Sequence, residues 1–285
     1  MALRRIQSDI KDIYNYKTTE CSVLDGIDYF YDEDNLTIGY GLVRGSVNTP
    51  YYQGFYLIKF VFPDTYPYEP PKCTHIKFCD KRQSPNFHDD GTICVSRLNT
   101  WNHKDTDRWL PSMDISSVLI MIRAQVLTEL PLDNEPSYNH SILDPLNSKK
   151  YDEFVRYCNY RYNVVKIYQK LKYHDLDISK ILCGQISHVI LSHIKAHKDE
   201  YIYNMTELKN LHEGKYYNCA TYVNSNTYCE YQDTLDLFKK YMGFADKIKI
   251  KMRCIMPDEG KKERQKNDSG IKSRDGSTES ISTEI

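Results

Sequence analysis

The sequence predicts an α+β fold in which a small antiparallel sheet packs on helices. Apolar residues recur at three- and four-residue intervals over residues 1–16, the spacing of a helix with one buried face. Short β-favouring runs separated by Gly, Asn and Pro then indicate an antiparallel meander. These runs are residues 36–43, 55–62 and 74–78. Helical spacing returns after residue 114, so sheet and helices occur in separate blocks, as in α+β proteins.

The elements after the meander are marked by local signals. Residues 62–71, FPDTYPYEPP, contain four prolines, which end both helices and strands. Asp114 can cap a helix that begins at Ile115 and is apolar nearly all round, which predicts a central position. Residues 151–173 form another helical stretch, rich in tyrosine.

Three regions are predicted along the chain. Residues 1–175 form the main folded core, and residues 176–256 form a small helical extension with apolar residues at helical spacing. Residues 257–285 contain no aromatic residue, carry mixed charge and are rich in Ser and Thr. Such a segment buries too little apolar surface to order itself, so we expect a disordered tail.

Composition narrows the classes of function. The 285 residues include 38 basic and 39 acidic side chains, which gives a net charge of −1. No strong positive field is therefore available for nucleic acid or an anionic membrane, and a protein partner is expected. No signal peptide or membrane-spanning run is recognisable, which predicts a cytoplasmic or nuclear location. The nine cysteines include no C-x-x-C pair, so reduced thiols are expected and no metal site is predicted.

One cysteine lies in a segment unlike the rest. In SPNFHDDGTICVSRLNTW, residues 84–101, Cys94 follows a Pro-Asn turn and a Gly. The order of the MALRRI helix, the meander, the proline-rich segment, this cysteine segment, a Trp-x-Pro and an acid-Pro turn resembles the catalytic core of the ubiquitin-conjugating enzymes. Asn86 lies eight residues before Cys94, as in that family, and Pro85 keeps the middle position of the His-Pro-Asn triplet. Ser84 replaces the histidine.

The resemblance covers about residues 1–173 and is greatest to the large, Z-type members of the family. It implies the ubiquitin-conjugating enzyme fold, a four-stranded antiparallel meander sheet flanked by helices, here with a C-terminal helical extension. It also implies that Cys94 accepts ubiquitin or a ubiquitin-like modifier as a thioester from an activating enzyme. The modifier then passes to a lysine of a protein substrate, with or without a ubiquitin ligase. ATP is consumed upstream by the activating enzyme, and no cofactor is bound here.

Two further catalytic residues are implied. The side-chain amide of Asn86 can donate to a developing oxyanion or can hold the loop, and the sequence leaves both roles open. Glu135 lies before a proline, where shorter relatives carry Asp, and is expected to position the incoming lysine. A solvated turn residue is the plain alternative for Glu135. Ser84 is expected to replace the hydrogen bonds of the missing histidine and not to act as a nucleophile.

The resemblance also implies two docking surfaces. The first helix would contact the activating enzyme through Arg4 and Arg5, although a solvated helix face is equally compatible with these charges. Two loops would contact ligases. Their expected residues are Phe62, Pro63, Trp109 and Pro111. Phe62 can equally end a strand in the core.

Two rival functions remain at this point. A catalytically silent variant would act as a protein-binding scaffold, but such variants typically lack the cysteine that Cys94 provides. A cysteine hydrolase would need a base with an orienting partner, and His88 is a weak candidate for that base. His193 and His197 are four residues apart, a spacing that can bind zinc, but no third ligand is evident.

Overall fold

The computed structural model describes residues 1–17, 24–101, 108–135, 144–218 and 226–247. Met1–Lys247 form one compact unit. The predicted core and helical extension thus fall largely within one unit. The predicted tail, residues 257–285, lies outside the described residues. None of the helices in the described parts of the chain is long and apolar enough to cross a lipid bilayer.

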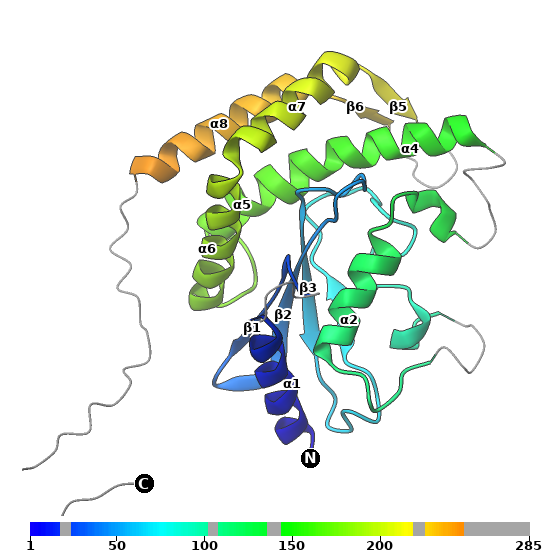
Figure 1. Cartoon of the computed structure of the whole chain (residues 1–285), viewed down its shortest axis with the longest axis vertical. Coiled ribbons are helices and arrows are strands. Elements are labelled where there is room, and N and C mark those ends of the chain that lie inside the picture. Colours follow the sequence, from blue (N-terminus) through cyan, green and yellow to red (C-terminus); the bar gives the residue numbers. More distant parts are fainter. Residues whose placement is uncertain (18–23, 102–107, 136–143, 219–225, 248–285) are drawn as a thin grey trace, which may run out of the picture. The chain divides into compact units, whose positions relative to one another are not determined.

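The centre of the fold is a four-stranded antiparallel sheet in the order β1-β2-β3-β4, which confirms the predicted meander (Figure 1). The helix α1 packs beside it and buries Ile6, Ile10 and Ile13 of the predicted apolar face, whereas Leu3, predicted on the same face, is exposed. Gly91 and Thr92 lie next to the last strand, through a bridge between Thr74 and Thr92. The bounds of these elements are α1 Ala2–Lys17, β1 Ile27–Asp32, β2 Asn35–Arg44, β3 Phe55–Val61 and β4 Lys72–His75.

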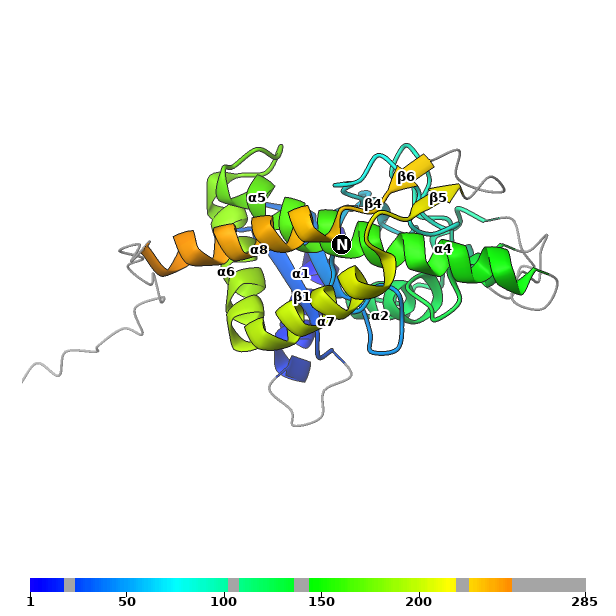
Figure 2. The same cartoon turned by 90° about the horizontal axis from the view of Figure 1, so that it is seen from above.

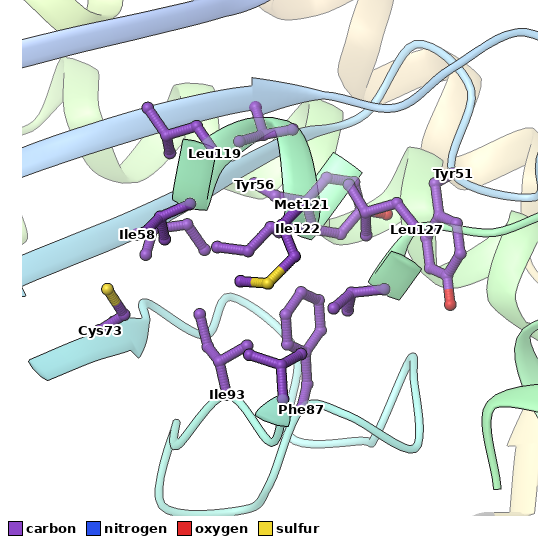
Figure 3. Packing of buried hydrophobic residues seen from close by; sticks show 14 of the residues in the cluster. Tyr51, Tyr56, Ile58, Cys73, Phe87, Ile93, Leu119, Met121, Ile122 and Leu127 are labelled. Carbon is purple, nitrogen blue, oxygen red and sulfur yellow. The ribbon is translucent and has the colours of Figure 1, made fainter. Parts of the chain in front are cut away.

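One face of the sheet is covered by the central helix α2, Ile115–Met121, which continues as the π-helix η3, Ile122–Val126. Asp114 caps α2, since its carboxylate accepts a hydrogen bond from the backbone N of Ser117 at 2.7 Å, as the sequence predicted. Gly41 lets the helix approach closely, because a Cβ there would lie 2.3 Å from Leu119. Figure 3 shows the helix residues packed with β3 and with residues of the cysteine loop.

The other face of the sheet is covered by helices from the second half of the chain (Figures 1 and 2). These helices bury Tyr40, Leu42, Phe55 and Leu57 of the sheet in a second core, together with Ile190 of α6. The helices of this layer are the π-helix η5 Asn159–Lys166, α5 Ile167–Lys172, α6 Lys180–Ala196, α7 Lys198–His212 and α8 Tyr231–Lys247. The preceding helix α4, Pro145–Cys158, buries its apolar residues in the same core as α2 instead. The described part of the predicted helical extension therefore packs on the sheet.

Polar contacts also join this layer to β2 and to the loop between β2 and β3. The hydroxyl of Tyr201 donates to the backbone O of Gln53 at 2.8 Å. Arg44 of β2 lies 2.8 Å from Nδ1 of His193 in α6. The sequence predicted only helices here, but the structure adds a two-stranded sheet of β5, Tyr216–Asn218, and β6, Asn226–Tyr228.

Candidate active site

The cysteine loop is a short hairpin anchored in the core. Phe87 and Ile93 form an antiparallel bridge, and the backbone N of Cys94 donates to the backbone O of Asn86 at 2.8 Å. The turn between them needs Gly91, which has φ +85° and lies too close to the backbone of β4 for a Cβ. Both Phe87 and Ile93 are buried beneath the loop (Figure 3). Core packing therefore fixes where Cys94 lies.

Cys94 lines a cavity of about 330 Å³ on the protein surface. The cavity brings together all three residues that were predicted to be catalytic, Cys94, Asn86 and Glu135. Glu135 reaches it because the 3-10 helix η4, Pro131–Asn134, ends there. Asn134 holds that helix in place by donating to the backbone O of Gln125 at 2.9 Å. The remaining lining residues are Arg82, Pro85, His88, Val95, Ser96, Trp101, Gln125 and Asn134.

The thiol of Cys94 is largely enclosed. The residue is 4% exposed, and its Sγ lies 3.5 Å from the backbone O of Thr100, to which it donates. Burial raises the pKa of Cys94 above its ordinary value; the positive charge of Arg82 opposes this effect, and the negative charge of Glu135 adds to it. The thiol is thus mainly protonated at neutral pH, and the cavity is the open space that Cys94 lines.

Asn86 supports the loop in this structure. Its side-chain Nδ2 donates to the backbone O of Cys94 at 2.7 Å, and its backbone N donates to Oγ of Ser84 at 3.2 Å. Ser84 is fully buried and lies 3.4 Å from the backbone O of Val126, to which its hydroxyl donates. Ser84, at the position of the family's histidine, thus forms hydrogen bonds with the backbone of Asn86 and Val126, as expected. Of the two roles open to Asn86, the contact observed here is the one that supports the loop.

Two residues that sequence reasoning missed also shape the loop. Thr100 Oγ1 donates to the backbone O of Ile93 at 2.6 Å and accepts from the backbone N of Val95 at 2.9 Å, on either side of Cys94. Arg82 donates to two backbone oxygens near Asn86. The Thr-Trp pair after the cysteine was a usable signal for Thr100. Nothing in the local pattern distinguished Arg82 from a solvated arginine.

The two histidines near the loop are poor candidates for a catalytic base. Among the described residues, Cys94 has no hydrogen bond to an imidazole, although His88 lines the same cavity. His75 is buried and stacks on Phe87 with ring centroids 4.1 Å apart. Burial lowers the pKa of His75 to about 3, so this ring stays neutral. No group of metal-binding side chains is found in the described part of the chain.

Arg4 and Arg5, which were predicted to contact the activating enzyme, lie in different environments on α1. Arg4 is exposed on α1. The guanidinium of Arg5 instead donates within the protein, to the backbone O of Pro111 at 2.8 Å and of Met113 at 2.6 Å. It also forms an ion pair with the buried Asp9 at 2.6 Å. Arg5 therefore ties α1 to the loop before α2, while Arg4 is available to a partner.

Two of the four residues predicted to contact ligases have buried side chains. Phe62 is 5% exposed and packs on Tyr66, with ring centroids 4.9 Å apart. Trp109 is 7% exposed, and its Nε1 donates to the backbone O of Pro67 at 2.6 Å. The exposed apolar side chains of these two loops are Tyr68 and Leu110, at 67% and 52%. Pro63 is half-buried and Pro111 is exposed.

The four-stranded meander, the central helix behind it and the hairpin that carries Cys94 define a known class. Residues 5–161, more than half of the chain, match the family model described as ubiquitin-conjugating enzyme. The chain therefore belongs to the ubiquitin-conjugating enzyme family, and the fold expected from the resemblance is confirmed.

Particular relatives agree with the expected subgroup. Ubiquitin-conjugating enzyme E2 Z of Danio rerio is 36% identical over 155 residues, which are 54% of this chain and 44% of the relative. Ubiquitin-conjugating enzyme E2 Z of Homo sapiens is 35% identical over 157 residues, 54% of this chain and 41% of the relative. The matched region thus spans less than half the length of either relative. Among solved structures, human ubiquitin-conjugating enzyme E2 G1 matches 41% of this chain and 88% of its own at 24% identity, with a TM-score of 0.34.

Proposed function

We propose that this protein carries ubiquitin or a ubiquitin-like modifier on Cys94 and transfers it to lysine side chains of protein substrates. The supporting observation is the cavity that gathers Cys94, Asn86 and Glu135 around a thiol without an imidazole partner among the described residues. A base beside the thiol would also activate water and waste the carried acyl group by hydrolysis. The arrangement therefore favours acyl carriage over hydrolysis.

The first step exchanges one thioester for another. The Cys94 thiol loses its proton, and the thiolate attacks the carbonyl carbon of the modifier's thioester on the activating enzyme. A new C–S bond forms, the bond to the donor sulfur breaks, and the donor thiolate leaves and takes up a proton. This exchange is nearly neutral in energy, so a strong base is not required. ATP is consumed by the activating enzyme, and this chain binds no cofactor.

The second step forms the amide. A neutral lysine amine attacks the same carbonyl carbon, a C–N bond forms, the C–S bond breaks, and the Cys94 thiolate leaves while the amine gives up a proton. Lysine is mostly protonated at neutral pH, so the site must favour its neutral, oriented form. Glu135, on the cavity wall, is placed to orient that amine, and Asn86 holds the loop that carries the reacting carbonyl.

Partners would approach from two sides. The exposed Arg4 on α1 would contact the activating enzyme, and Arg5 would shape that surface from within. Ligases would contact the loops around Pro63 and Pro111. No nucleic-acid or membrane partner is proposed, and the expected location is the cytoplasm or nucleus.

The test is formation of an adduct. The protein is incubated with an activating enzyme, ATP and ubiquitin, and the products are separated with and without a thiol reductant. A reductant-sensitive adduct is expected for the wild type, a stable ester for Cys94→Ser and no adduct for Cys94→Ala. Cys183→Ala, at a buried cysteine of α6, is the matched control and should charge like the wild type.

Two results would contradict the proposal. An adduct that survives in Cys94→Ala would place the carrier residue elsewhere. If no adduct forms with any modifier and activating enzyme tried, while the protein melts cooperatively, the catalytically silent scaffold becomes the better reading.

A further inference from the structure

We propose that Arg82 is a positioning residue of this site, which holds the backbone on both sides of Asn86 and keeps a fixed positive charge in the cavity of Cys94. The inference rests on the proposed role of Cys94 as the carrier. It adds a residue that the comparison with the family's cysteine segment did not bring out.

The guanidinium of Arg82 binds two backbone carbonyls at once. Its Nη2 donates to the backbone O of Pro85 at 2.5 Å, and its Nε donates to the backbone O of Phe87 at 3.0 Å. These two carbonyls flank Asn86, whose own side chain donates to Cys94. A displacement of the Arg82 side chain would therefore reach Cys94 through two intervening residues, Asn86 and one of its two neighbours.

The backbone of Arg82 is itself fixed to the core. Its carbonyl O accepts from the hydroxyl of Tyr151 in α4 at 3.0 Å, and Tyr151 is 1% exposed. The next carbonyl, of Gln83, accepts from the hydroxyl of Tyr51 at 2.7 Å. Two buried tyrosines thus fix the backbone at Arg82 and Gln83, so the Arg82 side chain extends from a rigid segment.

The charge of Arg82 has a second effect. Arg82 and Glu135 both line the cavity of Cys94, one with each sign of charge. The positive charge stabilises the thiolate, and it opposes the effects of burial and of Glu135 on the thiol. Guanidinium remains charged at every physiological pH, so this stabilisation does not titrate.

Lysine cannot fully replace this residue. A guanidinium presents several donors in a planar fork, which suits two carbonyls at once, whereas an ammonium is a compact point charge on a flexible stem. Arg82→Lys should keep the charge and lose the paired hydrogen bonds, and Arg82→Gln should lose both. The two variants therefore separate the electrostatic effect from the positioning effect.

The first measurement is intrinsic thiol reactivity. The full chain is treated with iodoacetamide between pH 6 and 10, and alkylation of Cys94 is followed by peptide mass spectrometry. Arg82→Gln should move the pH profile of Cys94 to higher pH; a shift of half a pKa unit lowers the rate at neutral pH by about threefold. Arg82→Lys should keep the midpoint of the wild-type pH profile, because its charge remains, while loss of the paired hydrogen bonds changes the rate at the plateau. This measurement needs no ubiquitin and stays informative even if the proposed function fails.

The second measurement is the rate of thioester formation at fixed pH. Both variants should be slower than the wild type, by roughly tenfold for lost positioning, with Arg82→Lys slow despite the near-normal midpoint of its alkylation profile. Arg97→Gln, at the nearest other arginine in the sequence, which does not line the cavity, is the matched control and should behave as the wild type in both assays.

Each result decides the proposal. If both Arg82 variants keep the alkylation profile and the thioester rate of the wild type to within twofold, the proposal is wrong. Equal loss of both activities in Arg82→Gln and Arg82→Lys, with a lowered melting temperature in each, would reduce Arg82 to a residue needed only for folding, which also overturns it.

Discussion

The chemistry at Cys94 depends on a small number of atoms whose positions are set by backbone contacts. Asn86, Ser84 and Thr100 all hydrogen-bond to main-chain atoms of the cysteine loop or of its neighbours. Net gains of about 0.5 to 1.5 kcal/mol per hydrogen bond make each contact modest, but the loop is short and they act together. At this scale, single substitutions should change reactivity without unfolding the protein.

Glu135→Gln should have opposite effects on two reactions of the same thiol. Loss of the negative charge lowers the pKa of Cys94, so alkylation at neutral pH should rise up to about threefold. Discharge of the modifier to free lysine should fall, because the amine loses the group that orients it. Single-turnover discharge and iodoacetamide labelling measure the two rates. If discharge is unchanged, Glu135 is a solvated turn residue.

Asn86→Ala separates the two roles that the sequence left open. Because Nδ2 of Asn86 holds the carbonyl of Cys94 at 2.7 Å, its removal should alter iodoacetamide labelling of Cys94 and also slow lysine discharge, by about tenfold or more. Alkylation has no oxyanion intermediate. Slow discharge with unchanged alkylation would therefore favour the oxyanion role over loop support.

At the scale of single elements, α1 is held by buried polar groups. The hydroxyl of Tyr66 donates to Asp9 of α1, and Asp9 in turn pairs with Arg5. This network joins α1, the proline-rich segment and the loop before α2. A buried pair that loses one partner leaves the other uncompensated, so its members should be sensitive to substitution.

Arg5→Met should destabilise the protein, whereas Arg4→Met should not. The substitution removes two hydrogen bonds to backbone and leaves Asp9 without its ion pair, which costs about 1 to 3 kcal/mol. The exposed Arg4 serves as the matched control. Thermal unfolding measures stability, and the dependence of thioester formation on activating-enzyme concentration measures docking. Equal melting temperatures for the two variants would contradict the bracing role of Arg5.

Asp152 of α4 should make stability depend on pH. Burial raises the pKa of Asp152 to about 7, well above the value of about 3.9 in an unfolded chain. A raised folded-state pKa favours the folded state at low pH, and that contribution is lost as pH rises from about 4 to about 7. Asp152→Asn should therefore be more stable than the wild type at pH 8, by on the order of 1 to 3 kcal/mol, and nearly equal at pH 4.

Urea unfolding at a series of pH values tests this. The exposed Asp64 provides a control substitution, Asp64→Asn, that should show no such growing difference. A difference between Asp152→Asn and the wild type that is constant from pH 4 to pH 8 would rule out the titration of Asp152 as its cause.

At the scale of the whole molecule, the second half of the chain covers the sheet. Ile190 of α6 is fully buried in the second core, and Ile181 of the same helix is 76% exposed. Ile190→Ala should destabilise the protein by about 2 to 5 kcal/mol, and Ile181→Ala should have little effect. Because Met1–Lys247 form one compact unit, the melt should remain a single transition. Two separate transitions would show that the helices form an independent domain.

The sequence predicted much of this molecule because its signals were local. Apolar spacing identified α1, Asp114 marked the start of α2, and a motif of fixed spacing located Cys94 and Asn86. What it missed depends on contacts between distant segments. No local pattern contains the neighbours that set three features of the fold. These are the hydrogen bonds of Arg82 to the cysteine loop, the hydrogen bonds of Arg5 within the protein and the burial of Trp109.

The two-sided burial of the sheet has a practical consequence for anyone who trims this protein. A chain that ended at Tyr173 would retain the four strands of the main sheet and the cysteine loop. It would lose α6, α7 and α8, which help to bury Tyr40, Leu42, Phe55 and Leu57, so these apolar side chains would become exposed to water. Exposed apolar surfaces of this kind associate with one another, so a shortened polypeptide should precipitate or form oligomers during purification. Biochemists who want the cysteine loop in soluble form should keep α6 and α7 attached.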